Sequence, residues 1–163
     1  MASRNDVRWL TGDQQKAWRA YIMGTELLLH QLDRELREEH EISFSEYEIL
    51  VRLSEAEGGR MRMAILADAM SHSRSRVTHT IARMERADLV VREASRADGR
   101  GVEAVMTADG RRVLNEAAPT HVRGVRAHFV DQLSDRQLAD IASALSAVVL
   151  DRDAAAGGCD EAK

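Results

Sequence analysis

The feature that most constrains the fold is a run of apolar residues spaced three and four positions apart, which continues to about residue 39. In a helix with 3.6 residues per turn, this spacing places side chains on one face. Thr11 and Gln14 have the spacing of a capping box, so we predict that a long amphipathic helix begins there. The apolar stripe consists of Trp18, Tyr21, Ile22, Thr25, Leu28, Leu29, Leu32 and Leu36.

The same signals predict two shorter helices. A second capping box, Ser43 with Glu46, begins a helix that Gly58-Gly59 ends. A third helix is expected over residues 62–70. Its expected inward side chains are Ile65, Leu66 and Met70.

A fourth helix and a hairpin are expected next. Ser71 or Ser73 can cap the helix after a short break. Residues 89–91 and 102–106 then have a β-like pattern on either side of a polar segment that contains glycines, which predicts two strands and a protruding loop. The expected buried side chains of the helix are Val77, Ile81 and Met84.

Two helices close the predicted fold. Thr107 begins the fifth, and Ser134 with Gln137 begins the sixth. Pro119, the only proline among 163 residues, falls within the fifth helix and is a site at which it can kink. We therefore predict a mainly α fold in which four helices, a small β-hairpin wing and two helices follow one another.

Charge is distributed unevenly along the chain. The net charge is −4, but residues 59–112 contain eleven basic and seven acidic side chains, and all eleven basic ones are Arg. Both flanking segments are acidic. A basic middle is what a protein that binds nucleic acid needs, although charge alone is weak evidence because scatter gives similar values.

Composition excludes several classes of protein. No stretch approaches the ~18 apolar residues of a transmembrane helix, and the first residues do not form a signal peptide. A single cysteine, Cys159, excludes an internal disulfide framework. The sequence contains no nucleophile–base signature and no glycine-rich phosphate loop. We expect a soluble cytoplasmic protein that is not an enzyme, has no cofactor and does not contact a membrane.

Two short helices joined by a tight turn and followed by a hairpin describe a winged helix-turn-helix, whose second helix enters the major groove of DNA. The face opposite the buried set carries Arg, Ser, Thr and His, which can bond bases or phosphates. A solvated face with ordinary charges is the alternative, but no acid lies between residues 71 and 84. The candidate major-groove residues are Arg74, Ser75, Arg76, Thr78, His79 and Arg83.

The loop of the predicted wing carries a second candidate set, Arg96, Asp98 and Arg100. An Arg on a protruding loop can reach a neighbouring minor groove, where narrow A·T tracts concentrate negative potential. Asp98 can orient Arg100 through a salt bridge. An exposed ion pair with no function is the alternative.

Several runs of residues resemble the MarR family of transcriptional regulators. The most specific is Asp98-Gly99-Arg100 followed by Met106-Thr107-Ala108-Asp109-Gly110, where family members usually have Leu-Thr. Ser73-Arg74-Ser75-Arg76-Val77-Thr78 and Met84-Glu85-Arg86-Ala87-Asp88-Leu89-Val90 also match. Family members usually have Gly where this chain has Asp88. The resemblance covers roughly residues 13–150.

This resemblance implies a homodimer in which the first and last helices interlock and two winged domains bind a pseudo-palindromic DNA operator, usually as a repressor. Arg100 would lie in the minor groove with Asp98 holding it. The expected domains are a platform helix at 1–40, the winged helix-turn-helix at 41–107, C-terminal dimerisation helices at 108–151 and a frayed tail at 152–163.

Many relatives respond to a small aromatic or phenolic ligand that binds between platform and DNA-binding domain. Ordinary core or dimer packing is the more common role for each aromatic side chain here. The candidate ligand-binding residues are Trp18, Tyr21, His30 and Tyr47.

Three alternatives stay open. A redox switch would use Cys159, whose acidic neighbours raise a thiol pKa and reduce its reactivity. A metal-responsive regulator would use His121 and His128, but no close Cys/His pair supports a metal site. A helical dimer could also act through protein contacts alone, against which Arg74, Arg76, Arg83 and Arg100 argue.

Overall fold

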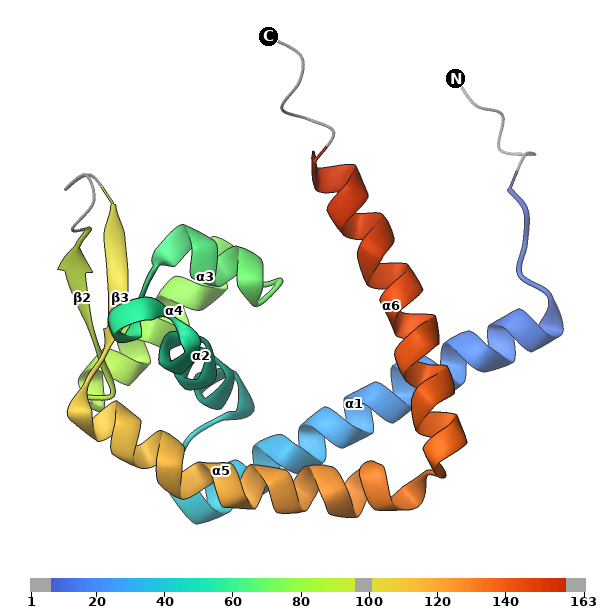
Figure 1. Cartoon of the computed structure of the whole chain (residues 1–163), viewed down its shortest axis with the longest axis horizontal. Coiled ribbons are helices and arrows are strands. Elements are labelled where there is room, and N and C mark those ends of the chain that lie inside the picture. The colour runs from blue at the N-terminus through green and yellow to red at the C-terminus, as the bar shows by residue number, and fades with distance from the viewer. Residues whose placement is uncertain (1–6, 96–100, 158–163) are drawn as a thin grey trace, which may run out of the picture. The chain divides into compact units, whose positions relative to one another are not determined.

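The structure, a computed structural model, describes residues 7–95 and 101–157, the last nine of them as backbone only. Its elements confirm the predicted mainly α class with a small wing (Figure 1). The helices are α1 (Gly12–His40), α2 (Phe44–Glu55), α3 (Met63–Ala69), α4 (Arg74–Arg86), α5 (Ala108–His128) and α6 (Asp135–Gly157). The strands are β1 (Arg60–Arg62), β2 (Val90–Ala94) and β3 (Val102–Met106), and two 3-10 turns are η1 (Glu57–Gly59) and η2 (Val130–Gln132).

The helices begin where the caps predict. Complete capping boxes start α1 and α2, with Thr11 and Ser43 as N-caps. Ser73, rather than Ser71, caps α4 by accepting a hydrogen bond from the backbone of Arg76 at 3.2 Å. Short-range hydrogen bonds of this kind involve residues three positions apart, which is why the sequence is sufficient to find them.

The sheet has three strands rather than two, in the order β1-β3-β2, and all pairs are antiparallel. Strand β2 lies beside β3 with Val90 opposite Met106 and Ala94 opposite Val102 (Figure 1). The expectation that the third helix begins at Arg62 is wrong, because residues 60–62 pair with β3. This pairing joins residues about 43 positions apart, so no local pattern indicates it.

The chain divides into two units between Val122 and Arg123, and the core lies in the first. The inward residues predicted for α4, Val77, Ile81 and Met84, are fully buried. On α3 the prediction for Ile65 is wrong: its side chain is 55% exposed, and Ala67 is buried beside Leu66 instead. Helix α3 has only seven residues, so few of its side chains can face the core.

Burial along α1 changes with position. Leu32 and Leu36 are buried, but Trp18, Tyr21 and Leu29 of the same predicted stripe are exposed. The exposed large apolar side chains between residues 7 and 29 are Val7, Trp9, Leu10, Trp18, Tyr21, Met23, Leu27 and Leu29. The part of the chain from residue 7 to Val122 therefore does not bury most of the N-terminal apolar surface of α1.

The last two helices continue past the residues at which the sequence predicts a possible kink or an end. Helix α5 continues through Pro119, and α6 extends to Gly157, beyond the expected end at residue 151. Within the described ranges, no helix is both long and apolar enough to cross a lipid bilayer.

The start of α5 is fastened to the turn before β2. The Thr107 hydroxyl donates to the Asp88 carbonyl at 2.6 Å and accepts from the Gly110 amide at 2.9 Å. A Cβ atom at Gly110 would lie 2.1 Å from the Leu89 carbonyl oxygen, so only glycine allows this approach. Asp88 has a φ of 56°, so it adopts the left-handed conformation for which glycine is the usual residue.

Candidate nucleic-acid interface

Five of the six candidate major-groove residues lie exposed on the first turns of α4. The Ser73 cap and the buried Val77 fix this end of the helix in orientation. The Thr78 hydroxyl donates to the Arg74 carbonyl at 2.8 Å, so its oxygen is left to accept a further hydrogen bond. These five residues are Arg74, Ser75, Arg76, Thr78 and His79, and Arg83, farther along α4, is exposed as well.

A cavity of about 310 Å³ adjoins the same end of α4. It brings Arg62 of β1 next to Arg74 and Thr78, and Gly101 and Val102 of the wing complete one side. Two guanidinium groups at the edge of a concave surface suit an anionic oxygen such as a DNA phosphate. The sequence pattern does not indicate Arg62, because its place on β1 depends on a long-range strand pairing.

The base of the wing is held by a buried carboxylate. Arg60 Nε donates to Glu103 at 2.7 Å while its Nη2 donates to Glu93 at 2.7 Å. The Ser95 hydroxyl donates to the other oxygen of Glu103 at 2.9 Å. Hydrogen bonds from Arg60 and Ser95 lower the pKa of Glu103, so this carboxylate is charged at neutral pH. Arg60 of β1 thus connects Glu103 of β3 with Glu93 of β2.

Arg92, on β2, forms an ion pair with Glu85 of α4 at 2.6 Å. The Arg92 amide also donates to Glu85 at 3.0 Å. This pair connects the wing to α4. The three candidate residues of the wing loop, Arg96, Asp98 and Arg100, lie outside the described residues.

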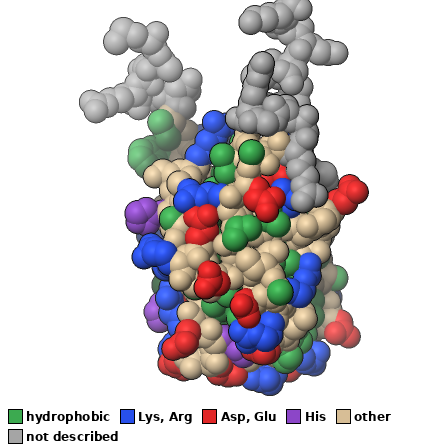
Figure 2. Space-filling view, turned by 90° about the vertical axis from the view of Figure 1, so that its left-hand side faces the viewer, with side chains coloured by type: hydrophobic (Ala, Val, Ile, Leu, Met, Phe, Trp, Pro, Cys, Tyr) green, Lys and Arg blue, Asp and Glu red, His purple; other side chains and the backbone are tan. Residues whose placement is uncertain are grey.

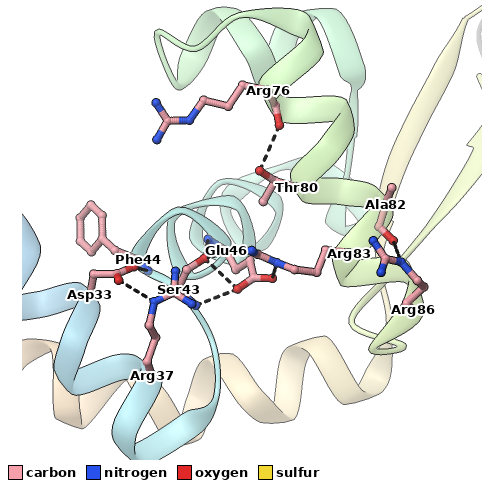
Figure 3. Close-up of polar contacts among 10 residues, drawn as sticks. All are labelled: Asp33, Arg37, Ser43, Phe44, Glu46, Arg76, Thr80, Ala82, Arg83 and Arg86. Carbon is pink, nitrogen blue, oxygen red and sulfur yellow. Dashed lines mark hydrogen bonds and ion pairs between the residues drawn. The ribbon is translucent and has the colours of Figure 1, made fainter.

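Arg83, the sixth candidate on α4, forms an ion pair with Glu46 of α2, although half of its side chain is exposed (Figure 3). Its Nε donates to Glu46 Oε1 at 2.7 Å and its Nη2 donates to Ser43 Oγ at 3.0 Å. Burial raises the pKa of Glu46, but hydrogen bonds from Arg83 and Ser43 outweigh it and hold that pKa below its usual value. Glu46 therefore stays charged at neutral pH.

The start of α2 is also bonded to α1 (Figure 3). Asp33 Oδ1 accepts from the Phe44 amide at 2.8 Å, and its Oδ2 accepts from Arg37 at 2.6 Å. A second link joins α1 to α5, where Thr120 donates to Glu39 at 2.8 Å and contacts His40 at 2.9 Å. The α4 helix is thus connected to α1 through the N-terminus of α2.

A second cavity, of about 290 Å³, lies between α2 and α5. The Tyr47 ring stacks on His121 with centroids 4.6 Å apart. In the described part of the chain, His121 Nδ1 is the one buried side-chain nitrogen or oxygen without a hydrogen-bond partner, and burial lowers the pKa of this His. The cavity is lined by Phe44, Tyr47, Glu48, Val51, Arg52 and His121.

Of the four candidate ligand-binding residues, only Tyr47 lines this cavity. Trp18 and Tyr21 are exposed on α1 with ring centroids 6.2 Å apart, and His30 is exposed on the same helix. Sequence analysis considered His121 only as a metal ligand. Its position opposite Tyr47 depends on the packing of α5, which periodicity alone does not give.

Charge on the wing side of the molecule is mixed. The space-filling view shows Lys and Arg side chains interspersed with Asp and Glu over this face (Figure 2). Among residues 7–95 and 101–157, no group of three or more His, Cys, Asp or Glu side chains could hold a metal ion. Cys159 lies outside the described residues.

Comparisons with known proteins give concordant results. The sequence profile of the MarR family matches residues 40–101. The crystal structure of AbsC, a MarR family transcriptional regulator from Streptomyces coelicolor, has 43% identity, covers 91% of this chain and 99% of its own, and gives a TM-score of 0.84. Sco3205, a MarR family regulator from the same organism solved in complex with DNA, has 36% identity, covers 90% and 91%, and also gives 0.84.

A more distant structure shares the fold alone. Sco5413, also from Streptomyces coelicolor, has 22% identity, covers 93% of this chain and 100% of its own, and gives a TM-score of 0.77. None of the curated proteins searched matches the chain.

Proposed function

Because the chain belongs to the MarR family of transcriptional regulators, we propose that it binds a pseudo-palindromic DNA operator as a homodimer and represses transcription. The observation that carries this proposal is the exposed start of α4, where Arg74, Ser75, Arg76, Thr78 and His79 stand beside Arg62. The solved complex of Sco3205 with DNA supports it. The protein acts as a regulator, not as an enzyme.

In this proposal the first turns of α4 enter the major groove. Arg76 and His79 contact base edges, and Arg74 with Arg62 binds a backbone phosphate at the cavity they share. The wing residues Arg96 and Arg100 reach the adjacent minor groove, with Asp98 orienting Arg100. The Arg60–Glu103 network at the base of the wing supports this, because it fixes the direction in which the loop projects.

The exposed apolar surface of α1 supports the homodimer. Trp18 is 57% exposed and Leu27 is 66% exposed, although both belong to an amphipathic helix that buries Leu32 and Leu36. Large exposed apolar patches mark interaction sites in soluble proteins. A twofold interface would cover this surface and place two α4 helices about one turn of DNA (~10 bp) apart.

The test is a titration of the purified protein against DNA from upstream of its own gene, at several salt concentrations and with unrelated DNA as competitor. We expect tight binding that survives the competitor and a protected pseudo-palindrome in footprinting. The double variant Arg74→Ala/Arg76→Ala should lower the salt slope by about two units, because the dimer loses one Arg74–phosphate contact from each protomer, and should weaken discrimination between operator variants, because it loses the Arg76 base contact. Binding no tighter than to unrelated DNA would refute a sequence-specific regulator.

We also propose that a small aromatic ligand releases the protein from DNA by binding in the cavity between α2 and α5. Support comes from the Tyr47 and Phe44 rings, which offer stacking surfaces, and from His121 Nδ1, which lacks a partner. Arg52 at the same cavity suits a carboxylate on the ligand. A ligand shifts the equilibrium only if it binds the DNA-free state more tightly.

Calorimetric titration with 2-, 3- and 4-hydroxybenzoate tests this second proposal. We expect at least one isomer to bind and to weaken operator affinity. Val51→Phe, which fills the cavity, should abolish ligand binding and leave operator binding intact. If Val51→Phe binds the same isomer with unchanged affinity, the ligand site lies elsewhere.

A further inference from the structure

Arg83 and Arg76 lie seven residues apart on α4, so they share one stripe of the helix. Their surroundings differ. Both side chains are exposed, but Arg76 lies beside the Ser73 cap, whereas Arg83, whose side chain is 50% exposed, reaches across to Glu46, which is 5% exposed. Figure 3 shows the Arg83 side chain directed at Glu46 and Ser43, with Arg76 a separate side chain near the start of the helix.

The Glu46 site is fully occupied by the protein itself. Glu46 Oε2 accepts from the Ser43 amide and the Ser43 hydroxyl, each at 2.7 Å, and Oε1 accepts from Arg83 Nε at 2.7 Å. Arg83 Nη2 closes the ring by donating to Ser43 Oγ at 3.0 Å. Removing one partner from such a buried group costs far more than losing an exposed ion pair.

A guanidinium committed in this way is poorly placed to recognise a base. The fork that recognises guanine uses two nitrogen donors in one plane, and two of the three Arg83 nitrogens already bind α2. Moving Arg83 to DNA would leave the Glu46 charge buried without its cation. The contact therefore favours a role within the protein.

We propose that Arg83 is a positioning residue, which fixes the tilt of α4 against the capped N-terminus of α2 and so sets the angle at which the recognition helix meets DNA. This inference rests on the proposed function. The contact joins residues 37 positions apart. At the same turn, Asp33 of α1 accepts a hydrogen bond from the Phe44 amide. The tilt of α4 is therefore fixed relative to α1, the helix that carries the proposed dimer surface.

Two single variants and their combination test the proposal. Arg83→Ala removes the cation, and Glu46→Gln removes the charge but keeps a capping-box residue. We expect each single variant to weaken operator binding about tenfold with an unchanged salt slope. The double variant should be no weaker than either single one, since residues that act through one contact are not additive.

Matched variants separate positioning from direct contact. Arg74→Ala should lower the salt slope by about two units, because the dimer loses one phosphate contact from each protomer. Arg86→Ala, one turn from Arg83 and bonded to its own helix at Ala82, should change neither affinity nor slope. Arg83→Lys should recover only part of the binding, because an ammonium cannot bind Glu46 and Ser43 as a fork.

Four results of the binding measurements would overturn the proposal. A salt slope lowered by about two units in Arg83→Ala, or full recovery by Arg83→Lys, assigns Arg83 to phosphate. Additive losses in the double variant separate Arg83 from Glu46. Unchanged affinity in Arg83→Ala removes any role in binding.

If the wild-type protein binds no operator, the proposed function is refuted but the positioning role of Arg83 is not. A measurement without DNA then tests that role. Spin labels on cysteines introduced at exposed Glu55 of α2 and Arg86 of α4, in a Cys159→Ser background, report the separation of the two helices. We expect Arg83→Ala to shift or broaden that distance distribution. An unchanged distribution would overturn the positioning role.

Discussion

The region from α2 to β3 and the N-terminal half of α1 both carry many apolar side chains, but only the first region buries them. Ile49, Leu50 and Leu53 of α2 are completely buried, whereas Trp18 and Leu27 of α1 are more than half exposed. In the first region, the buried carboxylates of Glu46 and Glu103 each accept a hydrogen bond from an arginine of the same region.

The difference indicates which part of the protomer buries its own apolar side chains. The region from α2 to β3, the helix–wing region, has three paired strands and capped helices, and its buried side chains form one core with Leu36 of α1 and with Leu114 and Ala117 of α5. Leaving the apolar face of α1 in water is unfavourable by roughly 25 cal/mol for each Å² of apolar surface. The proposed dimer resolves this imbalance, and the predictions below test each side of it.

The largest effect is expected on the α1 side. Leu27→Asp should raise the dimer dissociation constant about a thousandfold, because a buried Leu contributes about 2 kcal/mol and a twofold interface contains it twice. Analytical ultracentrifugation measures this change. Glu26→Gln, at the neighbouring exposed position, should leave the constant unchanged. If the Leu27→Asp variant dimerises as strongly as the wild-type protein, α1 is not the interface.

The next effect is expected where α5 begins. Gly110→Ala should lower the free energy of unfolding by about 3 kcal/mol, because its Cβ would lie 2.1 Å from the Leu89 carbonyl oxygen. Urea unfolding at fixed protomer concentration measures it. Gly24→Ala is the control: nothing lies within 4 Å of its Cβ, so α1 should gain about 1 kcal/mol from the better helix former. Equal responses at the two glycines would contradict the close approach.

A smaller, pH-dependent effect is expected at Glu46. The folded state lowers the pKa of this carboxyl below its usual 4.5, so the stabilisation is complete above pH 4.5 and is lost as pH falls through the lower folded-state value. Glu46→Gln should therefore be about 2 kcal/mol less stable than wild type at pH 7, with the gap closing in acid. Denaturant unfolding between pH 7 and pH 3 measures the gap.

The control for Glu46 is Glu116→Gln. Glu116 pairs with Arg112 at 3.1 Å on the exposed surface of α5, where an ion pair contributes at most about 0.5 kcal/mol. A gap between wild type and Glu46→Gln that stays constant from pH 7 to pH 3 would mean that the lost stability comes from packing rather than from charge.

How far the sequence predicts this molecule depends on the range of the interactions. The capping boxes at Thr11 and Ser43 and the buried stripe of α4 are set within one or two helical turns, and the structure confirms them. Strand β1 and the Arg83–Glu46 contact join residues about 40 positions apart, and no local pattern encodes them. The sequence predicts the candidate DNA-reading residues of α4 because helical periodicity places them opposite its buried stripe. It does not indicate Arg62, because a long-range strand pairing positions that residue.

The smallest effect is expected at the turn that leads into β2, in the helix–wing region. Asp88 has a φ of 56°, a conformation that costs an ordinary L-residue about 1 kcal/mol and glycine nothing. Glycine also loses more entropy on folding, so Asp88→Gly should gain only about 0.5 kcal/mol. Asp88→Ala should be destabilising, because alanine has the Cβ without the polar group that eases this conformation. Thermal unfolding of the two variants measures the difference. If Asp88→Gly is instead less stable than wild type, the Asp88 carboxylate contributes to the turn, and the helix–wing region depends on that side chain as well as on its backbone hydrogen bond from Thr107.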